Sequence, residues 1–123
     1  MKQALLDTNF ILTCVKQKID FFEDIKFMGL EILIPQQIIE EIKRVAKSKQ
    51  KGHSREAAEL ALRILEKNSY KKINLDKKPV DKGIKNFADK NKDIIVATLD
   101  RKLKNKIKNP KLIIKEKKRL EVI

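Results

Sequence analysis

Short apolar runs of the kind that form buried strands recur along the whole chain. They predict strands at residues 4–6, 31–34, 72–75, 94–98 and 112–114, with residues 120–123 as a candidate last strand. Several of these runs lack the alternating polar residues of a half-exposed strand. That pattern is typical of strands that are covered on both faces.

Amphipathic segments separate these runs. Their apolar residues recur every three or four positions, as on the buried side of a helix. They predict helices at residues 10–16, 21–28, 35–46, 56–67, 81–91 and 100–108. Strands that alternate with helices favour an α/β fold with a central, mainly parallel sheet.

Local signals add more specific expectations. Asn9 is placed to cap the first helix, and Gly29 to end the second. Residues 48–55 include Gly52 and several charged residues, and they predict an exposed loop. In the helix after that loop, helical spacing turns one set of apolar side chains inward: Ala57, Leu60, Ala61, Ile64 and Leu65.

Length and charge narrow the class of protein. A chain of 123 residues with no internal repeat or linker fits a single domain over residues 1–123. Thirty Lys and Arg against seventeen Asp and Glu give a formal net charge of +13, which favours a polyanionic partner, nucleic acid first. No apolar run approaches the ~18 residues of a membrane span. Because Asp7 and Asn9 also interrupt the apolar N-terminal stretch, we expect a cytoplasmic protein with no membrane partner.

Several kinds of active site are excluded by what the sequence lacks. Its three glycines form no phosphate-binding loop. His53 is the only histidine and is expected in the charged loop, so neither a histidine triad nor a histidine-rich metal site can be assembled. Cys14 is the only cysteine and is expected to be a small buried hydrophobic residue.

Carboxylates remain as candidates for chemistry. Asp7 and Asp100 each end an apolar strand run where a helix begins, which places them at the carboxyl edge of a parallel sheet. On a helical projection Glu41 borders the apolar side of its helix, whereas Glu40 faces solvent.

The same projection selects a fourth acid. Asp81 lies at the edge of the apolar face of its helix, whereas Asp89 points away from it. Four acids at one edge of the sheet would repel one another, and a divalent cation would relieve that repulsion. Sites made only of oxygen ligands favour Mg²⁺ or Mn²⁺, which can promote phosphodiester hydrolysis.

A purely structural explanation of three of these acids stays open. Asp7, Asp81 and Asp100 all precede predicted helices, and aspartate is a favoured N-cap residue. Capping alone could therefore explain them, and the capping and metal-binding roles are compatible.

Three stretches of the chain resemble a PIN domain: residues 5–10 (LLDTNF), 34–41 (IPQQIIEE) and 95–104 (IVATLDRKLK). The match runs nearly end to end. The chain resembles above all the eukaryotic pre-rRNA-processing (small-subunit processome) PIN nucleases and their archaeal relatives. Toxin-type PIN ribonucleases are similar in their fold and in their acidic site residues. The resemblance implies an α/β/α sandwich on a parallel sheet of about five strands, with Mg²⁺- or Mn²⁺-dependent endoribonuclease activity.

The resemblance also implies roles for single residues. The metal ligands and catalytic acids would be Asp7, Glu41, Asp81 and Asp100, with Asn9 and Thr98 as further catalytic-site residues. Thr98 would either orient a metal-bound water or bond the following turn. Close relatives often carry two adjacent acids where this chain has Asp81 and Lys82, so one ligand of a second metal is replaced by a side chain that could contact a phosphate.

Basic residues follow both Glu41 and Asp100. Together with the net charge they favour contacts to RNA phosphates, with a merely solvated face as the alternative. The predicted RNA contacts are Lys43, Arg44, Lys47, Lys82, Arg101, Lys102 and Lys104. Aromatic residues make up 5% of the chain and there is no Trp, so structured RNA read through its backbone and shape is favoured over base stacking.

The expected function is an endoribonuclease that processes rRNA or another structured RNA. The alternatives are the toxin ribonuclease of a toxin–antitoxin system, with an antitoxin as partner, and a non-catalytic RNA-binding module of ribosome assembly. A ribosome-assembly protein and a second copy of the chain are further candidate partners.

Overall fold

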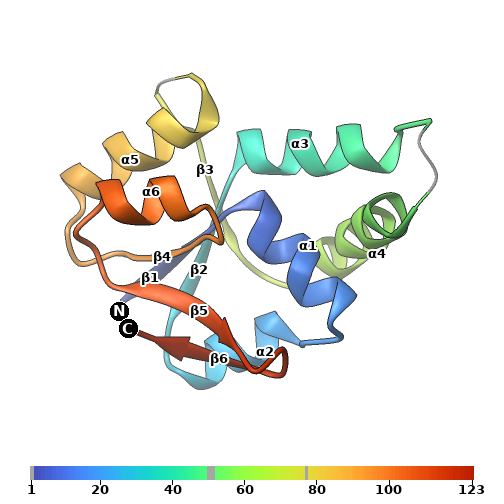
Figure 1. Ribbon diagram of the computed structural model, residues 1–123, viewed down its shortest axis with the longest axis horizontal. Helices are drawn as coiled ribbons and strands as arrows, with labels where there is room; N and C mark the ends of the chain where they lie inside the picture. Colours follow the sequence, from blue (N-terminus) through green and yellow to red (C-terminus); the bar gives the residue numbers. More distant parts are fainter. Residues whose placement is uncertain (1, 50–51, 77) are drawn as a thin grey trace.

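Strands and helices alternate as the sequence predicts in the computed structural model, which describes residues 2–49, 52–76 and 78–123. Within those residues the strands are β1 (Gln3–Leu6), β2 (Glu31–Pro35), β3 (Lys71–Ile73), β4 (Ile95–Ala97), β5 (Lys111–Lys115) and β6 (Arg119–Val122). The helices are α1 (Thr8–Lys16), α2 (Phe21–Phe27), α3 (Gln36–Ala46), α4 (His53–Lys67), α5 (Val80–Lys90) and α6 (Arg101–Lys106). Figure 1 traces them along the chain, and the α/β class is confirmed.

One sheet organises the chain. Its strand order is β3-β2-β1-β4-β5-β6, and all neighbouring strands are parallel except β5 and β6. The chain moves outward from β1 through β2 and β3, returns to the centre for β4, and then moves outward in the other direction. This reversal leaves β1 and β4 as neighbours. In open α/β sheets, ligands bind beyond the carboxyl ends of the strands at such a point.

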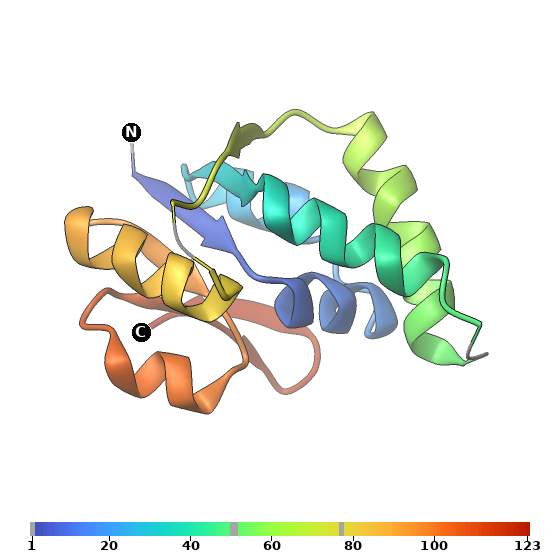
Figure 2. The same ribbon diagram turned by 90° about the horizontal axis from the view of Figure 1, so that it is seen from above.

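Helices cover the sheet on both sides. α1, α3 and α4 pack together on one side, and α5 and α6 lie together on the other, as Figures 1 and 2 show. α2 contacts β2 and β6. The expected layered arrangement is therefore present. In the described part of the chain the sheet has six strands rather than about five, because Arg119–Val122 turns back along β5.

The two central strands form the driest part of the core. Residues 4–6 and all of β4 are at most 4% exposed. Cys14 is fully buried, as predicted, and its burial raises the pKa of the thiol to about 12. The thiol therefore stays protonated at neutral pH and is a poor nucleophile. No helix in the described residues is long and apolar enough to cross a membrane.

Two expectations about helix starts were wrong. α1 begins at Thr8 with Asp7 as its N-cap, so Asn9 lies inside the helix and does not cap it. α4 begins at His53, so the charged loop is shorter than residues 48–55 and His53 is the first helical residue rather than a loop residue. The side chain of His53 lies outside the described part of the structure.

The inward face of α4 also differs from the prediction. Leu60 is 46% exposed. The helix turns a face of small residues toward α1 and α3, which lets the three helices approach closely. Its buried residues are Ala57, Ala58, Ala61 and Leu65. Gly29, by contrast, ends α2 as predicted, at a positive φ of 78° that glycine adopts without strain.

Asn109 is a buried polar residue that ties two connections of the chain together. It is 4% exposed, and its side-chain amide donates to the backbone carbonyl oxygens of Ala88, Asn91 and Ile94 at 3.2, 2.9 and 3.1 Å. These carbonyls belong to the end of α5 and the turn before β4, whereas Asn109 lies between α6 and β5. A buried amide and its acceptors are stable only when paired, so these bonds hold the two connections in register.

Replacing this amide tests the anchor. Asn109→Ala should lower the free energy of unfolding by about 2 kcal/mol, because a buried amide that bonds three carbonyl oxygens is lost; the carbonyls of Ala88 and Asn91 keep only their backbone donors. Urea denaturation measures the change. Asn105→Ala, at an exposed position of α6, is the control and should change stability by less than about 0.5 kcal/mol. Similar losses in both variants would contradict an anchoring role for Asn109.

Candidate functional site

Asp7 stands directly after β1, at the carboxyl edge of the sheet. Its backbone N–H donates to the carbonyl oxygen of Ala97 (2.9 Å), which extends the pairing of β1 with β4 by one residue. Its Oδ1 accepts from the backbone N–H of Thr8 (2.8 Å), and its Oδ2 accepts from the hydroxyl of Thr98 (2.8 Å). Both carboxylate oxygens are therefore held, and the side chain has one orientation.

Thr98 connects two of the candidate acids. It is fully buried at the end of β4. Its hydroxyl donates to Asp7 and accepts from the backbone N–H of Asp100 (3.1 Å). Of its two expected roles, bonding the following turn is therefore observed. The hydroxyl proton is directed to the Asp7 carboxylate, so Thr98 orients that acid.

Asp100 is the N-cap of α6. Its Oδ1 accepts from the backbone N–H groups of Lys102 (3.0 Å) and Leu103 (3.3 Å). The preceding residue is held from α1, because Oδ1 of Asn9 accepts from the backbone N–H of Leu99 (3.1 Å). Asn9 therefore fixes the loop that carries Asp100, which replaces the capping role expected from sequence.

Glu41 reaches the same place from α3. Its Oε1 accepts from the hydroxyl of Thr8 at 2.6 Å. Glu41 is half-buried, whereas Glu40 is exposed, although both line the same cleft. One turn earlier, Gln37 hydrogen-bonds Asn74 and both backbone groups of Leu75, which fixes the segment that leads to α5.

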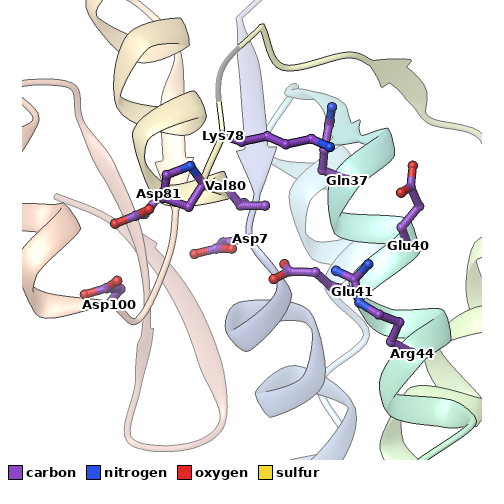
Figure 3. Close-up of a pocket in the computed structure, with 10 residues that line it drawn as sticks. Asp7, Gln37, Glu40, Glu41, Arg44, Lys78, Val80, Asp81 and Asp100 are labelled. Atoms are coloured by element: carbon purple, nitrogen blue, oxygen red, sulfur yellow. The ribbon is translucent and has the colours of Figure 1, made fainter.

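Asp81 is the least constrained of the four acids. It lies in the first turn of α5 and is exposed. It does not cap the helix, because the N-cap position is Pro79 and no side chain of the described residues caps it. Figure 3 shows Asp81 and Asp100 on one side of Asp7, with Glu41 on the other. The capping explanation therefore applies to Asp7 and Asp100 and fails for Asp81.

All four acids face one cleft of about 460 Å³. Its lining residues are Asp7, Gln37, Glu40, Glu41, Arg44, Lys78, Pro79, Val80, Asp81 and Asp100. Arg44 is the predicted RNA contact that lines it. The other predicted RNA contacts lie on or beside α3, α5 and α6. Lys104 is half-buried, and the rest are exposed: Lys43, Lys47, Lys82, Arg101 and Lys102.

The electrostatics of the cleft centre on Asp7. Burial raises the pKa of its carboxyl above the ordinary value, and the nearby charges of Glu41 and Asp100 raise it further. The hydrogen bonds from Thr98 and Thr8 act in the opposite direction but do not cancel the effect of burial on the pKa. Burial therefore disfavours the negative charge of Asp7, and the hydrogen bonds from Thr8 and Thr98 only partly stabilise that charge.

The cleft suits a divalent cation in charge and donor type. Its acids offer only carboxylate oxygens, which are ligands of Mg²⁺ and Mn²⁺, and a cation would relieve the repulsion around Asp7. Across residues 2–49, 52–76 and 78–123, no three acidic, histidine or cysteine side chains form a ready cluster of metal ligands. The acids thus face a common space without closing a cage.

Sequence reasoning missed two residues that shape this cleft. Thr8 is the first residue of α1, and it provides a backbone donor for Asp7 and a hydroxyl donor for Glu41. Gln37 was overlooked although it precedes Glu41 by four residues and so lies on the same face of α3. That spacing was the one signal in the sequence that could have identified it.

The raised pKa of Asp7 predicts a pH-dependent effect on stability. The folded state holds the proton of Asp7 more tightly than the unfolded state does. Stability therefore falls as the pH rises from the pKa of Asp7 in the unfolded state to its pKa in the folded state, and the loss is complete above the latter. Asp7→Asn removes that cost and keeps a capping oxygen. In metal-free buffer the variant should therefore melt at a higher temperature than the wild type near neutral pH.

The difference in Tm should shrink as the pH is lowered toward the ordinary range of an aspartate. Thermal melts followed by circular dichroism in EDTA over a pH series measure it. Asp93→Asn, at an exposed turn, is the control and should leave Tm nearly unchanged. An Asp7→Asn variant that melts below the wild type at neutral pH would show that the charge of Asp7 stabilises the fold.

Comparisons with known proteins agree on one family. A family model described as a PIN like domain matches residues 4–118. The chain is 34% identical over 129 residues to ribonuclease VapC4 of Methanocaldococcus jannaschii, covering 99% of this chain and 97% of that protein. The structure of the PIN domain endonuclease Utp24 matches with a TM-score of 0.77 and 26% identity, over 98% of this chain and 90% of the other. This chain therefore belongs to the PIN-like domain family.

Proposed function

We propose that this chain is an endoribonuclease that hydrolyses RNA phosphodiester bonds in the cleft beyond β1 and β4. One observation carries the proposal: Asp7 is held in a single orientation, partly out of water, close to the charges of Glu41 and Asp100. Similarity to proteins named a ribonuclease and an endonuclease supports the same chemistry.

We further propose that Mg²⁺ or Mn²⁺ is held by Asp7, Glu41, Asp81 and Asp100. When bound, such an ion neutralises charge on the phosphodiester and makes water a better nucleophile. The protein's own part is orientation, because donors fixed before binding need no reorganisation during the reaction. Thr8 and Thr98 supply that orientation for the acids near β1.

Contacts to RNA would come from the cleft and the surfaces around it. Arg44 lines the cleft and is placed to meet a phosphate beside the acids. The exposed cations around it would hold the rest of a structured RNA through its backbone: Lys43, Lys47, Lys82, Arg101 and Lys102, with the half-buried Lys104. Processing of rRNA or another structured RNA is the biological role that we propose, in the cytoplasm.

A second role has one observation in its favour. The 34% identity to ribonuclease VapC4 extends over almost the whole of both chains, and toxin-type PIN ribonucleases share the fold and acids. A toxin ribonuclease with an antitoxin as partner is therefore the second candidate. Growth arrest on expression, which Asp100→Asn relieves, would favour the toxin role over rRNA processing.

Cleavage of a structured RNA tests the endoribonuclease proposal. The wild type should cut in Mg²⁺ or Mn²⁺ and not in EDTA. Asp7→Asn and Asp100→Asn should each lower the rate at least about 100-fold, because a ligand of the ion is lost. Asp93→Asn should cut like the wild type. RNA that is bound but not cut in Mn²⁺ would instead identify a non-catalytic RNA-binding module.

The orienting role of Thr98 gives a separate prediction. Thr98→Val keeps the shape and removes the hydroxyl, so it should lower the cleavage rate about 10- to 100-fold and raise the Mn²⁺ concentration needed for half-maximal activity. Thr98→Ser keeps the hydroxyl and should retain most activity with an unchanged Mn²⁺ requirement. Equal losses in the two variants would show that packing of the methyl group matters and the hydrogen bond does not.

A further inference from the structure

A second hollow of the molecule lies between the far ends of α5 and α6. It encloses about 610 Å³. Its lining residues, which we call the basic groove, are Lys85, Asp89, Lys92, Lys106, Lys108 and Asn109. One wall comes from α5 and the turn after it, and the other from the end of α6 and the loop that follows.

The charges of the basic groove are not balanced. Its one carboxylate, on Asp89, is paired with Lys85 at 2.6 Å. The side-chain amines of Lys92, Lys106 and Lys108 make no hydrogen bond or ion pair with other described residues. The lining therefore carries a net charge of +3, and like charges gathered in one hollow repel one another. A bound polyanion would relieve that repulsion.

The backbone beneath these lysines is held in place. Asn109 forms part of the groove, and its amide bonds tie the end of α5 to the connection between α6 and β5. Lys111 adds hydrogen bonds from its Nζ to the carbonyl oxygens of Ile107 (3.2 Å) and Asn109 (2.9 Å). The two walls therefore keep a fixed separation, as a binding surface requires.

The basic groove lies along the two helices that begin at the catalytic cleft. α5 begins beside Asp81 and α6 begins after Asp100, and the two helices run side by side away from the cleft in Figures 1 and 2. Lys82 and Lys85 are three residues apart on α5, so they are neighbours on one face of the helix. Lys82 follows Asp81, which lines the cleft, and Lys85 lines the groove. A chain of phosphates that leaves the cleft along these helices meets the groove next.

We infer that the basic groove binds the sugar–phosphate backbone of the RNA substrate, several nucleotides from the phosphate that is cut. The inference rests on the proposed endoribonuclease function and adds a second binding site to it. Among the described residues, no aromatic or large apolar side chain lines the groove, and a protein partner would use such a side chain as an anchor. Lysine side chains are suited to bind the phosphates of a nucleic acid backbone.

The distance between cleft and groove sets the length of RNA involved. At about 1.5 Å per residue, α5 and the two residues after it extend roughly 16 Å from Asp81 to Lys92. A stacked strand rises about 3.4 Å per nucleotide, so the far end of the groove would meet the backbone roughly five nucleotides from the cut. Shorter RNA reaches the cleft and at most the near end of the groove at Lys85.

Binding measurements test the groove without requiring cleavage. The variant carries Lys92→Gln and Lys106→Gln, one exposed change on each wall. Its control carries Lys67→Gln at the end of α4 and Lys71→Gln at the start of the edge strand β3, which remove the same charge away from α5 and α6. Affinity for a fluorescently labelled single-stranded RNA of about 20 nucleotides, roughly four times the spacing of five nucleotides, would be followed in EDTA over a salt series.

Loss of two phosphate contacts should weaken binding and lower the slope of log affinity against log salt by about 1.4 for a single strand. The control should keep the wild-type slope. Urea melts of both variants should match the wild type within about 0.5 kcal/mol, because all four positions are exposed. Equal salt slopes for the variant, the control and the wild type would overturn the inference.

Cleavage of an RNA series trimmed from either end separates this inference from the proposed function. Wild-type kcat/KM should fall when fewer than about five nucleotides remain on one side of the cut. The groove variant should match the wild type on the shortest RNA and lose activity on the longer ones. If the variant and the control cut long RNA equally well, the groove is not a substrate site although the nuclease stands. If the wild type cuts none of the series, the proposed function fails, and the salt slopes still decide whether the groove binds RNA.

Discussion

The candidate site depends on the parallel pairing of β1 with β4 at the centre of the sheet. Leu5 lies opposite Val96 and Leu6 opposite Ala97, and the N–H of Asp7 makes the next bond of the same ladder. This register places Asp7 beside Thr98, 91 residues later in the chain. A shift of one residue would turn every side chain of the shifted strand to the other face of the sheet and separate the two. The burial of both strands holds the register, and with it the orientation of the acids.

Much of this arrangement could be predicted from local patterns. Asp7 and Asp100 follow apolar strand runs, and the carboxyl ends of parallel strands meet at one edge, so their position follows from the α/β alternation. Glu41 followed from helical spacing, because one residue changes the direction of a side chain by about 100°. The helix starts at Thr8 and His53 were misjudged because capping signals compete over neighbouring positions, and only packing decides between them.

Other features could not be predicted, because they depend on neighbours that are distant in sequence. Nothing beside Thr8 in the sequence indicates that its hydroxyl meets Glu41 on another helix. The three carbonyl oxygens bound by Asn109 belong to a connection 15 to 21 residues earlier. Leu60 was expected inside because it is apolar, yet the alanines of α4 allow a closer contact between helices and leave it outside. Periodicity predicts which face of an element is buried but not which polar groups then meet.

Acidic and basic side chains are separated around the cleft of this basic chain. Five acids line the cleft, while exposed lysines and arginines lie on the helices around it. A field of this kind draws a polyanion toward the molecule, whereas the carboxylates repel its phosphates at the last step. The same arrangement makes a cation in the cleft the natural partner of an approaching RNA, since it reverses the sign of the charge that the phosphate meets.

The buried setting of Asp7 places two demands on one residue. The backbone of residue 7 extends the pairing of the buried strands β1 and β4. Its side chain must also present a charged carboxylate to the cleft. Selection for stability alone would therefore favour asparagine at this position, since an amide fits the same space without the charge. Conservation of the aspartate among related sequences would indicate selection for catalysis rather than for stability.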